Sequence, residues 1–84
     1  MIDNMDEYIL QYIKTFGQGN CPEMAKFLIT IRKENYTDDR YQTYLKRINR
    51  HMKTLEKYGI VRYTGRTVSS SLRAKIWELD INEE

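Results

Sequence analysis

Apolar residues recur along three stretches of the chain at the three- and four-residue spacing that places them on one face of a helix. This spacing predicts helices over about residues 4–16, 22–34 and 39–58. Gly59 suits the position after a helix end, and Thr37 suits the cap before a helix start. The third stretch is the most regular, because its apolar positions step by four and three residues without a break: Tyr41, Leu45, Ile48, Met52 and Leu55.

The first two helices have shorter apolar faces. On the first, the inner face is expected to run through Met5, Ile9, Tyr12 and Phe16, with Ile13 beside it. On the second, the pattern places Ala25 and Leu28 inside, with Met24 and Ile31 next to them.

The last part of the chain changes to the pattern of strands. Ile60, Val61 and Tyr63 predict one strand and residues 75–79 a second, with residues 64–71 as a polar tip between them. We therefore expect a mainly helical α+β fold in one domain, residues 1–84. Three helices would be followed by a hairpin over about residues 60–79.

Positive charge is concentrated in one part of the chain. Residues 40–77 hold ten basic residues and a single acid, Glu56, so this segment carries +9 while the whole chain carries +2. On the third helix the basic residues lie opposite the apolar face, where an ordinary solvated helix would mix Glu with Lys. Such segregation favours a surface that binds a polyanion.

Composition excludes several other functions. One cysteine and one histidine exclude an internal disulfide and a multi-cysteine zinc site, and no residue cluster suggests an enzyme, a cofactor or a small-molecule ligand. No apolar run is long enough to span a membrane, and residues 1–6 lack the basic start of a signal peptide, so a cytoplasmic protein is expected. Cys21 is interpreted as a small buried residue rather than a reactive thiol.

The run from Ile48 to Val61 resembles the end of the recognition helix in a known superfamily. The sequence INRHMKTLEKYGIV is similar to the pattern V-S-R-H-L-x-x-L-E-x-x-G-L-V of the arsenic-repressor and multiple-antibiotic-resistance types of small prokaryotic and archaeal regulators. The segments EMAKFL (residues 23–28) and KIWEL (residues 75–79) resemble their second helix and second wing strand. The stretch between Ala25 and Ile48 is longer than in those repressors, so longer helices or a longer turn are expected there.

This resemblance implies a winged helix-turn-helix fold and a sequence-specific regulator of transcription that binds double-stranded DNA and is encoded by a prokaryote, an archaeon, a virus or a plasmid. A repressor is expected rather than an activator. The recognition helix would lie in the major groove and the basic wing on the adjacent minor groove or phosphates. Arg50 aligns with the Arg of the pattern and Asn49 with its Ser. The predicted DNA-binding residues are Gln42, Thr43, Lys46, Arg47, Asn49, Arg50, Lys53, Lys57, Arg66, Thr67 and Arg73.

Roles within this set follow from groove geometry. Thr43, Lys46, Arg47 and Arg50 are the candidates for base edges, whereas Lys53 and Lys57, further along the helix, are candidates for phosphate. A palindromic operator favours a homodimer, with Ile2, Leu10 and Ile13 of the first helix as candidate contacts and a monomer as the alternative. Two other functions stay open: a winged-helix module that binds proteins, and a non-specific or architectural nucleic-acid binder.

Overall fold

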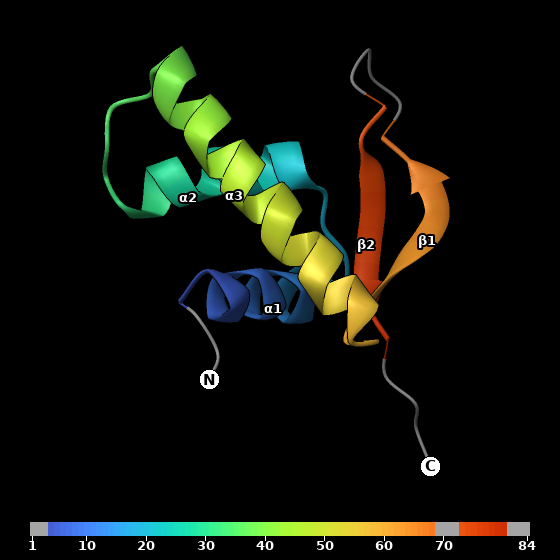
Figure 1. The fold of residues 1–84 in the computed structure, drawn as a ribbon. Coiled ribbons are helices and arrows are strands. Elements are labelled where there is room, and N and C mark those ends of the chain that lie inside the picture. Colours follow the sequence, from blue (N-terminus) through green and yellow to red (C-terminus); the bar gives the residue numbers. More distant parts are fainter. Residues whose placement is uncertain (1–3, 69–72, 81–84) are drawn as a thin grey trace.

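The computed structural model describes residues 4–68 and 73–80 and has the predicted order of elements. Helices α1 (Asn4–Phe16), α2 (Cys21–Ile31) and α3 (Asp38–Lys57) precede strands β1 (Val61–Thr67) and β2 (Lys75–Leu79), which pair antiparallel. Figure 1 shows α3 crossing over α1 and α2, with the hairpin standing beside the C-terminal half of α3. The expected α+β class, three helices with a two-stranded sheet, is therefore confirmed.

The hydrophobic core lies beneath α3. Ile48 and Met52, in the middle of the apolar row on α3, have no exposed surface. The predicted row holds, with Tyr44 buried and Leu45 half-buried at its edge. Each large side chain of this kind stabilises the fold by about 1.5–3 kcal/mol when fully buried. The core consists of these residues: Met5, Ile9, Ile13, Cys21, Met24, Ala25, Leu28, Ile29, Tyr41, Tyr44, Ile48, Met52, Leu55, Val61 and Trp77.

Two predicted core positions are wrong. Phe16 is 56% exposed and Ile31 is 49% exposed. On α1 the buried positions Met5, Ile9 and Ile13 recur once per helical turn, whereas Phe16 shares their face but is the last residue of the helix, beyond these buried positions. On α2, Ile29 takes the inner position instead of Ile31, because the helix ends at Ile31 and turns away.

The end of α2 differs from the predicted end near residue 34. The amide N–H groups of Lys33 and Glu34 donate to the carbonyls of Thr30 and Ile29, at 3.0 and 3.1 Å, which is the pattern of a Schellman motif. Lys33 takes the left-handed φ of 55° that this motif requires. Glycine is the usual residue at this position, so the sequence carried no clear signal that the helix stops here. The motif recurs at the end of α3, where Gly59 has a φ of 74°.

Strand β1 of the hairpin is also longer than predicted. β1 continues to Thr67, so residues 64–67 belong to a strand rather than to the polar tip. The pairing shifts between Tyr63 and Thr67, which face Trp77 and Lys75, so β1 holds extra residues at a bulge that includes Gly65. A bulge bends its strand and redirects side chains. Residues 69–71 of the predicted tip lie outside the described residues.

A backbone bridge joins the hairpin to the helices. Gly19, between α1 and α2, donates its N–H to the carbonyl of Trp77 at 2.9 Å and accepts the N–H of Trp77 at 2.8 Å. A side chain at residue 19 would come within 2.9 Å of Met24 and Tyr12, so only glycine fits there without displacing them. The bridge fixes β2 against the start of α2.

Side-chain hydrogen bonds also tie the helices to one another. Tyr8 of α1 donates its hydroxyl to the carbonyl of Met24 in α2 at 2.6 Å. Nδ1 of His51 in α3 lies 2.7 Å from Oδ1 of Asp6 in α1. Both contacts are partly buried, where a hydrogen bond is less weakened by water than at the surface.

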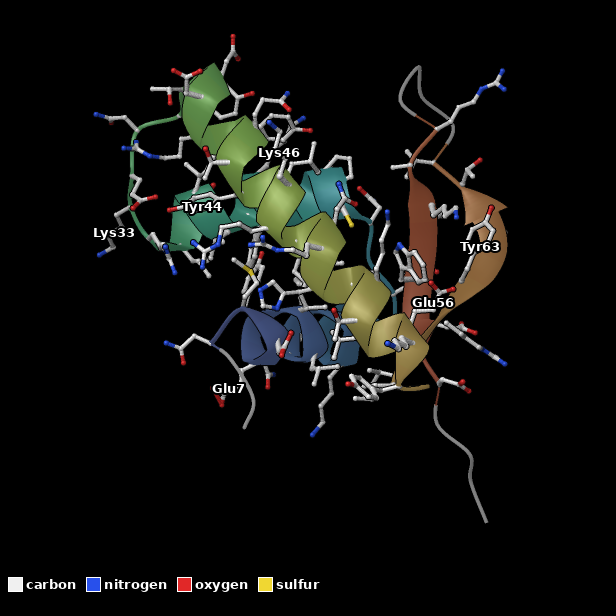
Figure 2. The ribbon with its side chains drawn as sticks, in the orientation of Figure 1. Glu7, Lys33, Tyr44, Lys46, Glu56 and Tyr63 are labelled. Carbon is white, nitrogen blue, oxygen red and sulfur yellow. The ribbon has the colours of Figure 1, made fainter. Side chains whose placement is uncertain are left out.

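Tyr44 holds the connection between α2 and α3, which spans residues 32–37. Its hydroxyl donates to Oε1 of Glu34 at 2.5 Å and accepts from Nη1 of Arg32 at 3.1 Å. Arg40 adds a contact to Glu34 at 3.7 Å and donates to the carbonyl of Asn35. Figure 2 shows Tyr44 on the side of α3 that faces α2. A connection longer than a minimal helix-turn-helix turn is thus fixed by side chains.

We expect Tyr44→Phe to lower the free energy of unfolding by about 1 kcal/mol, because the ring stays in the core while the hydroxyl bonds are lost. Chemical denaturation followed by circular dichroism measures this change. Tyr58→Phe is the matched control, since Tyr58 is 70% exposed. Equal effects of the two substitutions would show that the Tyr44 hydroxyl does not stabilise the fold.

Candidate nucleic-acid interface

The outer face of α3 carries the first part of the candidate site. This outer face is polar because the opposite face of α3 packs in the core, so the polar residues between the apolar positions must point to solvent. Seven of the eight α3 candidates are exposed, and Arg47 is half-buried. Figure 2 shows Lys46 on this outer side of the helix. Between residues 42 and 57 the face has five basic residues and only one acid, Glu56, near its end.

The middle of this face is a shallow cationic depression. It is lined by Lys46, Asn49, Arg50, Lys53 and Thr54. The hydroxyl of Thr54 donates to the carbonyl of Arg50 at 3.3 Å, so Thr54 is turned back toward the helix. The side chains of Lys46, Asn49, Arg50 and Lys53 are exposed hydrogen-bond donors. Arg and Lys side chains donate to guanine edges and to phosphates, and Asn pairs with adenine.

The hairpin carries the second part of the candidate site. Arg66, Thr67 and Arg73 are all exposed, and Arg73 has a left-handed φ of 47°. Arg66 donates from Nη2 to Oε1 of Gln18 at 3.1 Å, so this arginine links β1 to the segment between α1 and α2. Lower on the hairpin, Arg62 pairs with Glu78 at 2.6 Å, which neutralises one positive charge of the basic segment.

A groove of about 440 Å³ lies between α3, the start of α2 and β2, and it joins the two parts of the site. Its floor is apolar: Cys21, Pro22, Tyr41, Leu45, Ala74 and Trp77. Its rim is polar or basic: Gln42, Asn49, Lys53 and Lys75. None of the described residues that line it is acidic. Three of the predicted residues, Gln42, Asn49 and Lys53, therefore border a groove as well as the outer face of α3.

Lys75 was missed as a site residue. Its Nζ lies 5.1 Å from the ring centre of Tyr63 and 5.9 Å from that of Trp77, so two cation–π contacts hold it above the strand pair. Tyr63 and Trp77 face each other across the hairpin with ring centres 6.0 Å apart. The signal was present in the sequence, because alternation along a strand places Lys75 and Trp77 on the same side of the sheet.

Two further findings concern residues 4–68 and 73–80. These residues include no group of three or more His, Cys, Asp and Glu side chains that could hold a metal ion. No helix within them combines the length and the apolar character needed to cross a membrane.

An exposed aromatic cluster lies apart from α3, on α1 and α2. Phe16 is 56% exposed and Phe27 is 39% exposed, with ring centres 5.9 Å apart. Tyr12 packs against both, at 4.7 and 5.5 Å. Of the candidate dimer contacts, Ile13 is only 1% exposed and packs in the core of its own chain, so it cannot serve as an interface residue. Leu10 is half-buried, and Ile2 lies outside the described residues.

The thiol of Cys21 in the groove floor is expected to react slowly. Burial raises its pKa to about 11, so the nucleophilic thiolate is scarce until the pH approaches that value. In the folded protein at mildly alkaline pH, alkylation should be at least about a hundredfold slower than in the urea-unfolded chain. The rate should rise with pH up to the raised pKa. Mass spectrometry after timed alkylation measures both rates, and equal rates would mean that the thiol is accessible.

No known protein family matches the chain, and no curated protein or solved structure matches it either.

Proposed function

We propose that this protein is a winged helix-turn-helix regulator of transcription that binds specific sequences of double-stranded DNA and represses by occupying its site. The observation that carries the proposal is the outer face of α3 between residues 42 and 57, which combines basic residues with Thr, Asn and Gln and has Glu56 as its one acid. Phosphates attract the basic residues, whereas base edges need directional donors and acceptors such as Asn49 and Arg50.

The arrangement of the hairpin supports the winged-helix part of the proposal. The bridge between Gly19 and Trp77 places a short extended segment after α1 against β2. The order is then helix, extended segment, two helices and two strands, which is the order of a winged helix-turn-helix domain. The basic residues of the hairpin would contact the groove or backbone beside the one that α3 enters.

The charges along α3 indicate which part of it lies deepest in the major groove. Asp38 and Asp39 begin the helix, where they favour its positive end. Phosphates would repel these acids, so the first turn of α3 should stay outside the groove. The residues that read bases are then in the middle of the helix, between Lys46 and Arg50, within the stretch that forms the cationic depression.

Binding and specificity can be tested in one experiment. The purified protein is titrated into a random-sequence duplex pool across a salt series, with fluorescence anisotropy as the readout, and the bound DNA is recovered and sequenced. A steep salt dependence together with an enriched motif supports the proposal. A steep dependence without enrichment would favour the non-specific binder, and no binding at low salt would reject a nucleic-acid function.

Arg50→Ala should weaken binding to the enriched sequence by about 1–3 kcal/mol and relax the preference at one base position. Anisotropy against the enriched duplex and against single-base variants measures both effects. Lys26→Ala is the control, because Lys26 is an exposed basic residue of α2 outside the site. If Arg50→Ala binds every duplex as the wild type does, α3 does not read DNA through this residue.

The exposed aromatic cluster of Tyr12, Phe16 and Phe27 also favours a protein–protein contact. The proposed partner is a second copy of this chain. A two-fold dimer would present two α3 helices to a palindromic site, and apolar surface on α1 and α2 is available for the contact without covering α3. Exposed aromatic side chains that pack against one another are common at such interfaces.

Phe16→Ser should convert a dimer into a monomer without loss of the fold, because Phe16 contributes little to the core. Sedimentation velocity at several protein concentrations measures the oligomeric state, and circular dichroism checks the helix content. Tyr58→Ser, at another exposed aromatic residue, is the control. A wild-type protein that remains monomeric at every concentration would rule out the contact.

A further inference from the structure

We propose that the groove between α3 and β2 holds the sugar–phosphate backbone of one DNA strand, with phosphates beside Lys53 and Lys75 and deoxyribose rings on the apolar floor. This inference rests on the proposed function and deepens it. In this proposal Lys75 contacts a phosphate, and the apolar floor of the groove favours deoxyribose over ribose.

Charge is the first reason for this occupant. Lys53 on α3 and Lys75 on β2 belong to opposite walls of the groove, and the described lining residues include no acid. The ring faces of Tyr63 and Trp77 hold the Lys75 ammonium at 5.1 and 5.9 Å, so a cation is positioned there before any ligand arrives. An anionic chain that runs along the groove would pass between two cations.

The apolar floor is the second reason. Of the floor residues, the largely buried Tyr41 carries the one side-chain oxygen, whereas Leu45, Ala74 and Trp77 offer none that could accept a hydrogen bond from a sugar hydroxyl. The C2′ methylene of deoxyribose can contact such a surface without cost, whereas the 2′-hydroxyl of ribose would lose hydrogen bonds to water there. The floor therefore suits the sugar of DNA better than that of RNA.

Continuity with α3 is the third reason. Gln42, Asn49 and Lys53 line the groove and also belong to the outer face of α3. A strand whose bases are read by the middle of α3 has its own backbone at the edge of that helix, and this edge is the groove. The hairpin then forms the far wall of the channel that the backbone occupies.

The first test measures the phosphate contacts. With a fixed-sequence DNA duplex, Lys75→Gln should reduce the slope of log affinity against log salt by about one, and Lys53→Gln should do the same. Lys75→Arg should keep the slope, because the charge and the cation–π contacts remain. Lys26→Gln is the matched control, and circular dichroism confirms that each variant is folded. Unchanged slopes in both Gln variants would overturn the phosphate assignment.

The second test measures the sugar contacts. Single deoxyriboses in the same duplex are replaced by riboses, one position at a time. We expect about fivefold weaker binding at one or two adjacent positions. In Leu45→Ser, whose new hydroxyl can bond to a ribose, the penalty should shrink at those same positions. A uniform response along the duplex would overturn the sugar assignment.

The two proposals can fail separately. If the wild-type protein binds no duplex, the proposed function fails. If it binds DNA and depends on Arg50 but not on Lys75, Lys53 or the sugar, then only the groove assignment fails.

Discussion

Burial of a single row of side chains on α3 is the constraint on which the rest of the structure depends. Ile48 and Met52 have no exposed surface, and the row as a whole packs on α1 and α2. Because a helix turns about 100° per residue, fixing this row also fixes which residues point outward. Lys46, Arg50 and Lys53 are therefore presented to solvent by the same packing that stabilises the fold, and no separate loop is needed to hold the candidate site.

Trp77 plays a comparable role for the hairpin. It is 7% exposed, it exchanges two backbone hydrogen bonds with Gly19, and its ring packs at a tilt against that of Tyr63 across the strand pair. A two-stranded hairpin alone is marginally stable in water, so its position relative to α3 must come from contacts of this kind. The position of Lys75, and with it the width of the groove, thus follows from one buried aromatic side chain.

The sequence predicted the parts of this fold that depend on local periodicity, and it missed the parts that depend on tertiary contacts. The start of α3 is marked by Thr37, whose hydroxyl accepts from the N–H of Arg40, and its apolar row was evident from spacing alone. The end of α2 was not evident from the sequence, because Lys33 adopts the left-handed conformation that glycine usually adopts at a helix end. The exposure of Phe16 depends on where α3 covers α1, which no local pattern states. In the candidate site, exposure of the α3 residues could be predicted from the helix face, and the side that Lys75 shares with Trp77 from strand alternation. The groove could not be predicted, because it depends on the pairing of β2 with Gly19.

The length of α3 and the charges at its two ends together limit how the helix can approach a polyanion. Asp38 and Asp39 stabilise the N-terminal end of the helix but repel phosphate, and Glu56 near the other end also repels phosphate. Lys46, Arg47, Arg50 and Lys53 lie between these acids, so the favourable potential is strongest near the middle and falls toward both ends. A helix that approached end-on would place acids against phosphates. One that lies along the groove, with its middle at the base edges and the hairpin beside it, keeps every acid at the periphery. In the proposed complex with DNA, the acids that stabilise the start of the helix therefore also favour one orientation of it.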